Sequence, residues 1–179
     1  GVEMGKSVWV VDAAHSLAEF SVKHMMIATV KGRFTQIEGR IEADPEDIPS
    51  ASFEGSVTVA SINTADEARD QHLRSADFFD AENYPTLTFK STRIERDGDD
   101  YKMTGDLTIR GVTRPVTFDL EFEGTGKDPW GNEKIGFSAT TKISRKEFGL
   151  TWNAALETGG VLVGDQVKIE LHLEAAKQA

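Results

Sequence analysis

The sequence contains no cysteine, and this absence removes several kinds of chemistry at once. Disulfide frameworks, thiolate nucleophiles and thiolate metal sites are excluded, because none of the 179 residues is Cys. Basic residues are also scarce: 20 Lys and Arg stand against 30 Asp and Glu, which gives a net charge of -10. Nucleic-acid binding depends on clustered cations, so we predict no nucleic-acid partner. The same charge disfavours lasting adhesion to anionic lipid.

Long apolar runs and catalytic signatures are missing as well. No run approaches the roughly 20 apolar residues that cross a bilayer, so we predict no stable membrane insertion. The sequence has no nucleophile elbow, zinc-protease motif or phosphate loop, and its four histidines are scattered. We therefore predict no metal, cofactor or catalytic residue. The chain also begins without a secretory signal, so we expect a cytoplasmic protein, or a periplasmic or secreted one if a signal was removed.

What the sequence does contain is alternation of apolar and polar residues, the pattern of half-buried β-strands. It recurs along most of the chain, with an Asp97-Gly98 hairpin signal and a final strand that reaches Leu173. The pattern predicts eight or nine antiparallel strands, with a bulge or bend near Thr35-Gln36. Long strands with internal glycines favour a barrel over a sandwich. We expect one domain over residues 7–175, a flexible N-terminus over 1–6 and a tail over 176–179.

One stretch, Thr64 to Pro85, does not alternate. Thr64 and Glu67 have the spacing of a capping box, so a helix should begin there, with Asp70 and Arg74 left for water. Two adjacent rings, Phe78 and Phe79, follow the helical pattern. The segment is therefore predicted to be either a lid over a ligand site or a simple cover for one end of the sheet.

The ordered phrases of the chain resemble the YceI-like family, also described as polyisoprenoid-binding proteins. The resemblance spans nearly the whole sequence and rests on these phrases: residues 12–16 (DAAHS), 20–24 (FSVKH), 32–34 (GRF), 61–64 (SINT), 69–73 (RDQHL), 77–80 (DFFD), 84–85 (YP), 105–113 (GDLTIRGVT), 145–149 (RKEFG) and 163–165 (VGD).

This resemblance implies an all-β fold: an antiparallel, eight-stranded, lipocalin-like barrel with a short helical insertion around residues 65–80. It also implies a tunnel that carries or sequesters a polyisoprenoid, an isoprenoid quinone or a fatty-acyl lipid. The tunnel lining we predict is Phe20, Val22, Phe34, Val57, Val59, Phe89, Met103, Leu107, Phe118 and Phe137. Contacts near the lid or mouth are Met25, His72, Leu73, Phe78, Phe79 and Trp152.

The sequence is also compatible with two other functions. The protein could be an enzyme that acts on a lipid-like substrate, with His72 or a buried carboxylate as base. It could also be a structural or interaction domain whose core is filled by the same aromatic rings. The long edge strands expected from the alternation would permit a homodimer.

Overall fold

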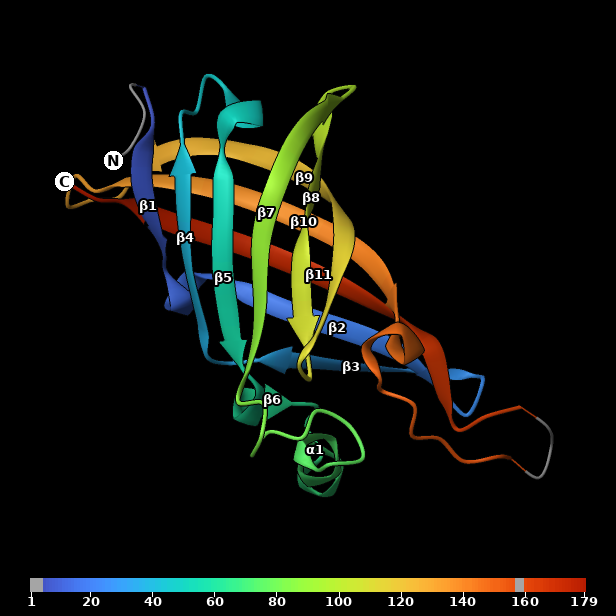
Figure 1. The fold of residues 1–179 in the computed structure, drawn as a ribbon. Helices are drawn as coiled ribbons and strands as arrows, with labels where there is room; N and C mark the ends of the chain where they lie inside the picture. Colours follow the sequence, from blue (N-terminus) through green and yellow to red (C-terminus); the bar gives the residue numbers. More distant parts are fainter. Residues whose placement is uncertain (1–4, 157–159) are drawn as a thin grey trace.

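The computed structural model describes residues 5–156 and 160–179. Strands dominate it (Figure 1), and they run as follows: β1 Ser7–Val11, β2 Leu17–His24, β3 Ala28–Phe34, β4 Ile37–Ala43, β5 Ser52–Thr58, β6 Ile62–Asn63, β7 Thr86–Asp97, β8 Asp100–Ile109, β9 Val112–Lys127, β10 Glu133–Ser144 and β11 Val163–Lys177. The α-helix is α1, Glu67–Arg74, and four short 3-10 helices are η1 Ala13–His15, η2 Ile48–Ser50, η3 Val59–Ser61 and η4 Arg145–Phe148.

Eight of these strands close into an antiparallel barrel, as the alternation and the resemblance predict. The order around the ring is β1-β4-β5-β7-β8-β9-β10-β11, and β11 pairs back with β1 at Trp9↔Lys177. Earlier in its course β11 pairs with β2 instead, and β3 and β6 continue the sheet from there. Closure of the ring reduces the number of edge strands, but β3 keeps an open edge, because it pairs with β6 only at Arg33 and Phe34. The homodimer stays a prediction.

The bend predicted near Thr35-Gln36 is confirmed, because the chain bends at Thr35 between β3 and β4, which pair with different partners, β2 and β5. At the C-terminus, β11 runs two residues into the expected tail, and Gln178 N donates to the Val8 carbonyl at 2.8 Å. At the other terminus β1 begins at Ser7, and of residues 1–6 only Gly5 and Lys6 are described.

The hydrophobic core fills one part of the barrel. Its side chains come from inward positions of successive strands, as the alternation dictates, and its largest members include Trp9, Ile41, Tyr101, Leu120, Ile135 and Phe137. Phe137 packs edge-on against Phe53, with ring centroids 4.9 Å apart. The barrel is therefore solid in this region.

Helix α1 lies beyond one end of the barrel (Figure 1), but it begins differently from the prediction. The N-cap is Asp66, whose side chain accepts from Arg69 N, so the capping box from Thr64 does not form. Thr64 is buried instead, and its backbone N–H and hydroxyl both donate to Asp70 Oδ1. Asp70 is thus a buried anchor of the helix and not a solvated residue.

We expect Asp70→Ala to lower the free energy of unfolding by about 2 kcal/mol, because it leaves the buried Thr64 N–H without an acceptor. Asp70→Asn should lose less, since its amide oxygen can still accept. Urea unfolding measures both values, with the exposed Glu67→Ala as the matched control on the same helix. A loss for Asp70→Ala no larger than that control would show that the anchor contributes nothing.

No helix in the described ranges is long and apolar enough to cross a membrane.

Candidate functional site

Between the solid core and the α1 end, the barrel encloses a cavity of about 200 Å³. Its walls come from strands β1 to β5 and β7 to β11 and from the segment that contains Leu73, Phe78 and Phe79. Nearly all of the exposed wall is apolar. The interior of this barrel is therefore divided into a packed part and an open part.

Most of the predicted lining residues stand in the cavity wall. They are Phe20, Val22, Phe34, Val57, Leu73, Phe78, Phe79, Phe89, Met103, Leu107 and Phe118. Leu73 is the one residue of α1 among them, so the segment that follows the helix supplies most of the cover. As ligand contacts, all of these residues remain predictions.

Five predicted residues stand elsewhere. Val59 is buried in η3, because β5 ends at Thr58, and Phe137 faces inward but belongs to the packed core. Met25 is exposed at the β2–β3 turn. His72 and Trp152 lie behind the wall, in contact with Phe78.

Several wall residues were not predicted as contacts: Val11, Ile37, Leu87, Ile109, Ile143, Arg145, Leu150, Val163, Val167, Ile169, Leu171 and Leu173. The alternation of the last strand places Val167, Ile169, Leu171 and Leu173 on its inner face. That pattern marks which side chains face inward but not which of them face empty space. Arg145 had no such signal, because it lies in η4 after β10 has ended.

A three-ring cluster backs the cavity at this end. His72, Phe78 and Trp152 meet edge-on or tilted, with centroids 4.6 to 5.2 Å apart, so they join the α1 segment to the loop after η4. His72 Nε2 lies 2.9 Å from Asp77 Oδ2. The imidazole is thus paired outside the cavity and is wrongly placed to act as a base on a ligand inside it.

Arg145 is the buried charged side chain of the wall. It donates to the carbonyls of Gly164 and Leu150 at 2.8 Å each, and to those of Trp152 and Val163 at 3.3 Å each. Its guanidinium carbon lies 6.0 Å from the centre of the Phe78 ring. Burial lowers the pKa of Arg145, and the nearby Asp165 opposes that effect.

The carboxylate of Asp165 is engaged by Ser144 and by the Lys146 backbone N–H. The hydrogen-bond partners of Arg145 in the described structure are therefore neutral carbonyls. This leaves a positive charge beside an apolar cavity.

Four other charged residues adjoin the cavity, but with their backbone and not with their charged groups. They are Glu19, Glu38, Arg40 and Glu54. Each follows or precedes residues that face inward, such as Ala18 and Phe20 or Ile37 and Ile41, so alternation directs these charged side chains outward. The cavity surface therefore offers dispersion contacts, and the Arg145 cation lies within the wall beneath it.

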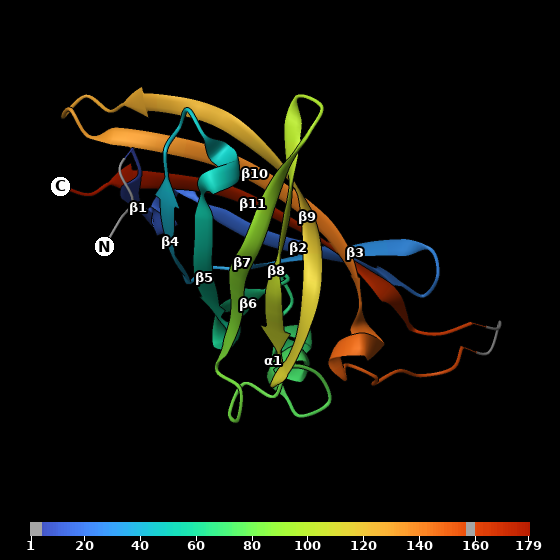
Figure 2. The ribbon, with the colours of Figure 1, turned by 45° about the horizontal axis from the view of Figure 1, so that its top comes forward.

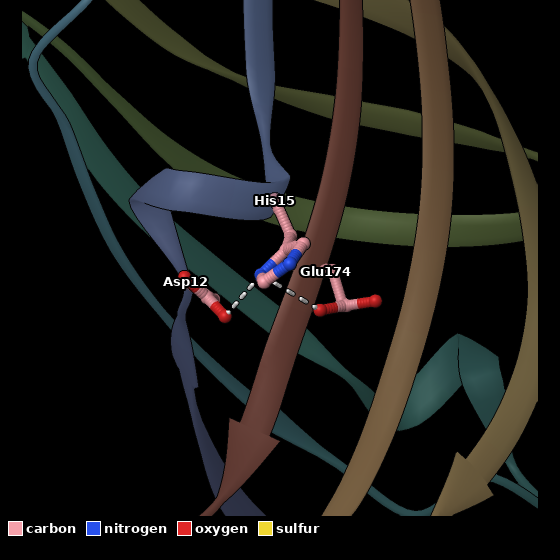
Figure 3. Close-up of side chains that lie close together, drawn as sticks. All are labelled: Asp12, His15 and Glu174. Carbon is pink, nitrogen blue, oxygen red and sulfur yellow. Dashed lines mark hydrogen bonds and ion pairs between the residues drawn. The ribbon is translucent and has the colours of Figure 1, made fainter. Parts of the chain in front are cut away.

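Ionisable groups also converge where β1 and β2 meet β11 (Figure 3). His15 Nδ1 lies 2.8 Å from Asp12 Oδ2 and 3.6 Å from Glu174 Oε2, and Lys134 Nζ lies 3.6 Å from the same Asp12 oxygen. These ligand types can hold a metal. The lysine ammonium already neutralises the carboxylate, however, so we interpret the group as an ion-pair network that joins the β1–β2 connection to β10 and β11.

The hydrogen bond that His15 donates to Asp12 raises the pKa of His15, with Glu174 adding to the effect, and the same bond lowers the pKa of Asp12. The interaction should therefore stabilise the fold below the unfolded-state pKa of histidine and fade as pH rises through the raised value. We expect Asp12→Asn to lower the pKa of His15 toward its ordinary value in an NMR titration. Asp106→Asn, on the outer face of β8, serves as control; equal titration curves for His15 in both variants would contradict the pairing.

Comparisons with known proteins agree with this geometry. The model of the YceI-like domain matches residues 9–175. The UPF0312 protein SA2479 of Staphylococcus aureus is 42% identical over 164 residues, covering 91% of this chain and 94% of that protein. The crystal structure of BcnA from Burkholderia cenocepacia superposes with a TM-score of 0.80 at 28% identity, covering 92% of this chain and 98% of BcnA.

A more distant structure has the same fold. It is a polyisoprenoid binding domain from Saccharophagus degradans, implicated in plant cell wall breakdown, with a TM-score of 0.71 at 16% identity, covering 95% of this chain and 98% of that one. The match of the domain model across nearly the whole chain, together with the Staphylococcus relative, decides the assignment. The chain belongs to the YceI-like family.

Proposed function

We propose that the protein binds one long-chain apolar lipid inside its barrel and carries or sequesters it. The observation that carries this proposal is the apolar cavity of about 200 Å³ within a closed barrel. The ligand class is a polyisoprenoid, an isoprenoid quinone or a fatty-acyl derivative. The polyisoprenoid binding domain of the same fold supports the first of these classes.

The size of the cavity favours a slim chain. Pockets for drug-sized ligands measure roughly 300–1,000 Å³, so a cavity of about 200 Å³ suits a narrow chain better than a bulky ring system. Burial of such a chain gains up to about 0.8 kcal/mol per methylene before the costs of ordering are subtracted. Chain length should therefore control affinity.

The position of Arg145 favours one orientation of a lipid bound in the cavity. A lipid whose polar end carries an oxygen acceptor would be favoured with that end beside the guanidinium, because this cation donates its hydrogen bonds to neutral carbonyls and the nearby Asp165 is engaged by Ser144 and the Lys146 backbone. The apolar tail would then extend toward the packed core, past Phe89 and Phe118, whose rings meet edge-on at 5.1 Å.

Binding is favoured over catalysis by what the described wall presents. His72 is paired with Asp77 behind the wall, and the buried carboxylate of Asp70 is engaged by Thr64. Neither group can reach a chain in the cavity to move a proton. The family match and the binding domain among its structural neighbours support the same choice.

A titration with a fluorescent polyene fatty acid and with its methyl ester tests the proposal. Both probes should bind, and a series of saturated fatty acids should displace them with affinities that rise up to about fourfold per added methylene until the cavity is full. The ester should bind more weakly than the acid, because it brings no charge to Arg145. Affinities that do not depend on chain length would contradict a buried chain.

A further inference from the structure

Three consecutive apolar side chains protrude where β2 turns into β3. Met25, Met26 and Ile27 are 49%, 59% and 83% exposed, and Val161, near the start of β11, is 40% exposed beside them. We call these four residues the apolar tip. The β2–β3 turn projects beyond the barrel (Figures 1 and 2). Clustered exposure of this kind marks an interaction surface more often than isolated exposed residues do.

The side chains of the tip are unfavourable for the backbone conformation of its turn. Met25 and Met26 have φ angles of 55° and 66°, in the left-handed region that Asn and Gly adopt with least strain. An Asn-Gly pair would form this turn more easily and would be better hydrated. The methionines therefore bring strain and exposure without burying their own side chains, which points to a role outside the fold.

The tip is continuous with the cavity wall. Met25 N donates to the Leu162 carbonyl at 2.7 Å, so the turn is tied to the chain entering β11. Val22 and Val163, on these same two strands, line the cavity, and Val163 pairs with His24 directly before the turn. A lipid leaving along these strands would meet the tip next.

Charge identifies the kind of partner. Although the chain has a net charge of -10, residues 20–37 contain Lys23, Lys31 and Arg33 and no Asp or Glu. All three cations are exposed. Apolar side chains at a basic hairpin match the surface of an anionic phospholipid bilayer. Apolar side chains enter the boundary between headgroups and acyl chains there, and cations contact the phosphates.

We propose that the apolar tip docks the protein on the surface of an anionic phospholipid bilayer. Met25, Met26 and Ile27 enter the boundary between headgroups and acyl chains, and Lys23 and Lys31 contact phosphates. The acidic remainder of the molecule is repelled by the same surface, so docking is brief, in keeping with the prediction that the whole chain does not adhere lastingly. Docking does not depend on what the cavity holds.

Co-flotation with phosphatidylcholine vesicles, with and without phosphatidylglycerol, tests this. The wild-type protein should float with the anionic vesicles, less so as salt is added, and weakly with phosphatidylcholine alone. The variant Met25→Asn/Met26→Gly/Ile27→Ser keeps a favourable turn and should bind at least tenfold more weakly. Lys23→Glu/Lys31→Glu should lose binding to the anionic vesicles only.

Trp130→Ser is the matched control. Trp130 is 83% exposed, like Ile27, but lies in the β9–β10 turn at the other end of the barrel (Figures 1 and 2), so its loss should leave flotation unchanged. Equal flotation of the tip variant and the wild type would overturn the proposal. So would a wild-type dimer in sedimentation equilibrium that the tip variant converts to monomers, because the tip would then cover a second copy of the chain. Failure of docking with intact binding of the fluorescent probes would leave the proposed lipid binding standing.

Discussion

Leu107→Trp is expected to abolish binding of the fluorescent fatty acid, with at least a tenfold loss of affinity. Leu107 lies on β8 directly across from Phe89, is 8% exposed and faces the cavity. An indole at this position would occupy much of a cavity of about 200 Å³. Because the change adds bulk only inside, the outer surface and the apolar tip should be unaffected.

Overpacking can also destabilise a barrel, typically by about 1–3 kcal/mol, so loss of binding must be measured on folded protein. Thermal unfolding followed by circular dichroism establishes this. Leu107→Met nearly preserves side-chain volume and should bind the probe like the wild type. A folded Leu107→Trp variant with undiminished affinity would mean that the ligand does not occupy this cavity.

Arg145→Met should cause the largest loss of stability, about 4 kcal/mol or more. Its guanidinium donates to four backbone carbonyls, two of them at 2.8 Å, in the loop after η4 and at the start of β11. The Val163 carbonyl keeps a second donor, Asn153 Nδ2 at 2.7 Å, so the cost falls on the other three. Each carbonyl left buried without a donor costs about 1–3 kcal/mol, less where water replaces the lost donor. The aromatic contact with Phe78 is lost as well.

Guanidinium chloride unfolding measures this effect. Arg145→Lys should be intermediate, because an ammonium keeps the charge but cannot reproduce the planar fork of donors. Lys146→Met, on the exposed side of the same turn, should change stability by less than about 0.5 kcal/mol. Equal stability of the Arg145→Met and Lys146→Met variants would show that the carbonyl contacts are dispensable.

The sequence predicted the barrel because alternation is a direct record of which side chains face inward. The sequence could not separate the cavity from the core, since alternation places both Phe118 on β9 and Phe137 on β10 on the inner face of the barrel. Phe137 meets Phe53 and Phe122, at 4.9 and 5.4 Å, whereas Phe118 meets Phe89 at the edge of open space. That difference depends on how distant strands cross, which no local pattern contains.

The helix start shows a second limit. The spacing of Thr64 and Glu67 predicted a capping box that starts at Thr64. The structure uses Asp66, because Thr64 is held by Asp70 and its hydroxyl and carbonyl also accept from Arg69, each at 2.8 Å. This choice depends on the contact between the buried Asp70 and Thr64, which a capping rule does not include.

Native mass spectrometry of the protein purified without delipidation, followed by solvent extraction of the same sample, decides whether the barrel interior holds an apolar chain. We expect a complex heavier than the polypeptide by the mass of one lipid, and recovery of that lipid in the extract. A native mass equal to that of the polypeptide alone, with repeated extracts free of lipid, would mean that the barrel holds no such ligand.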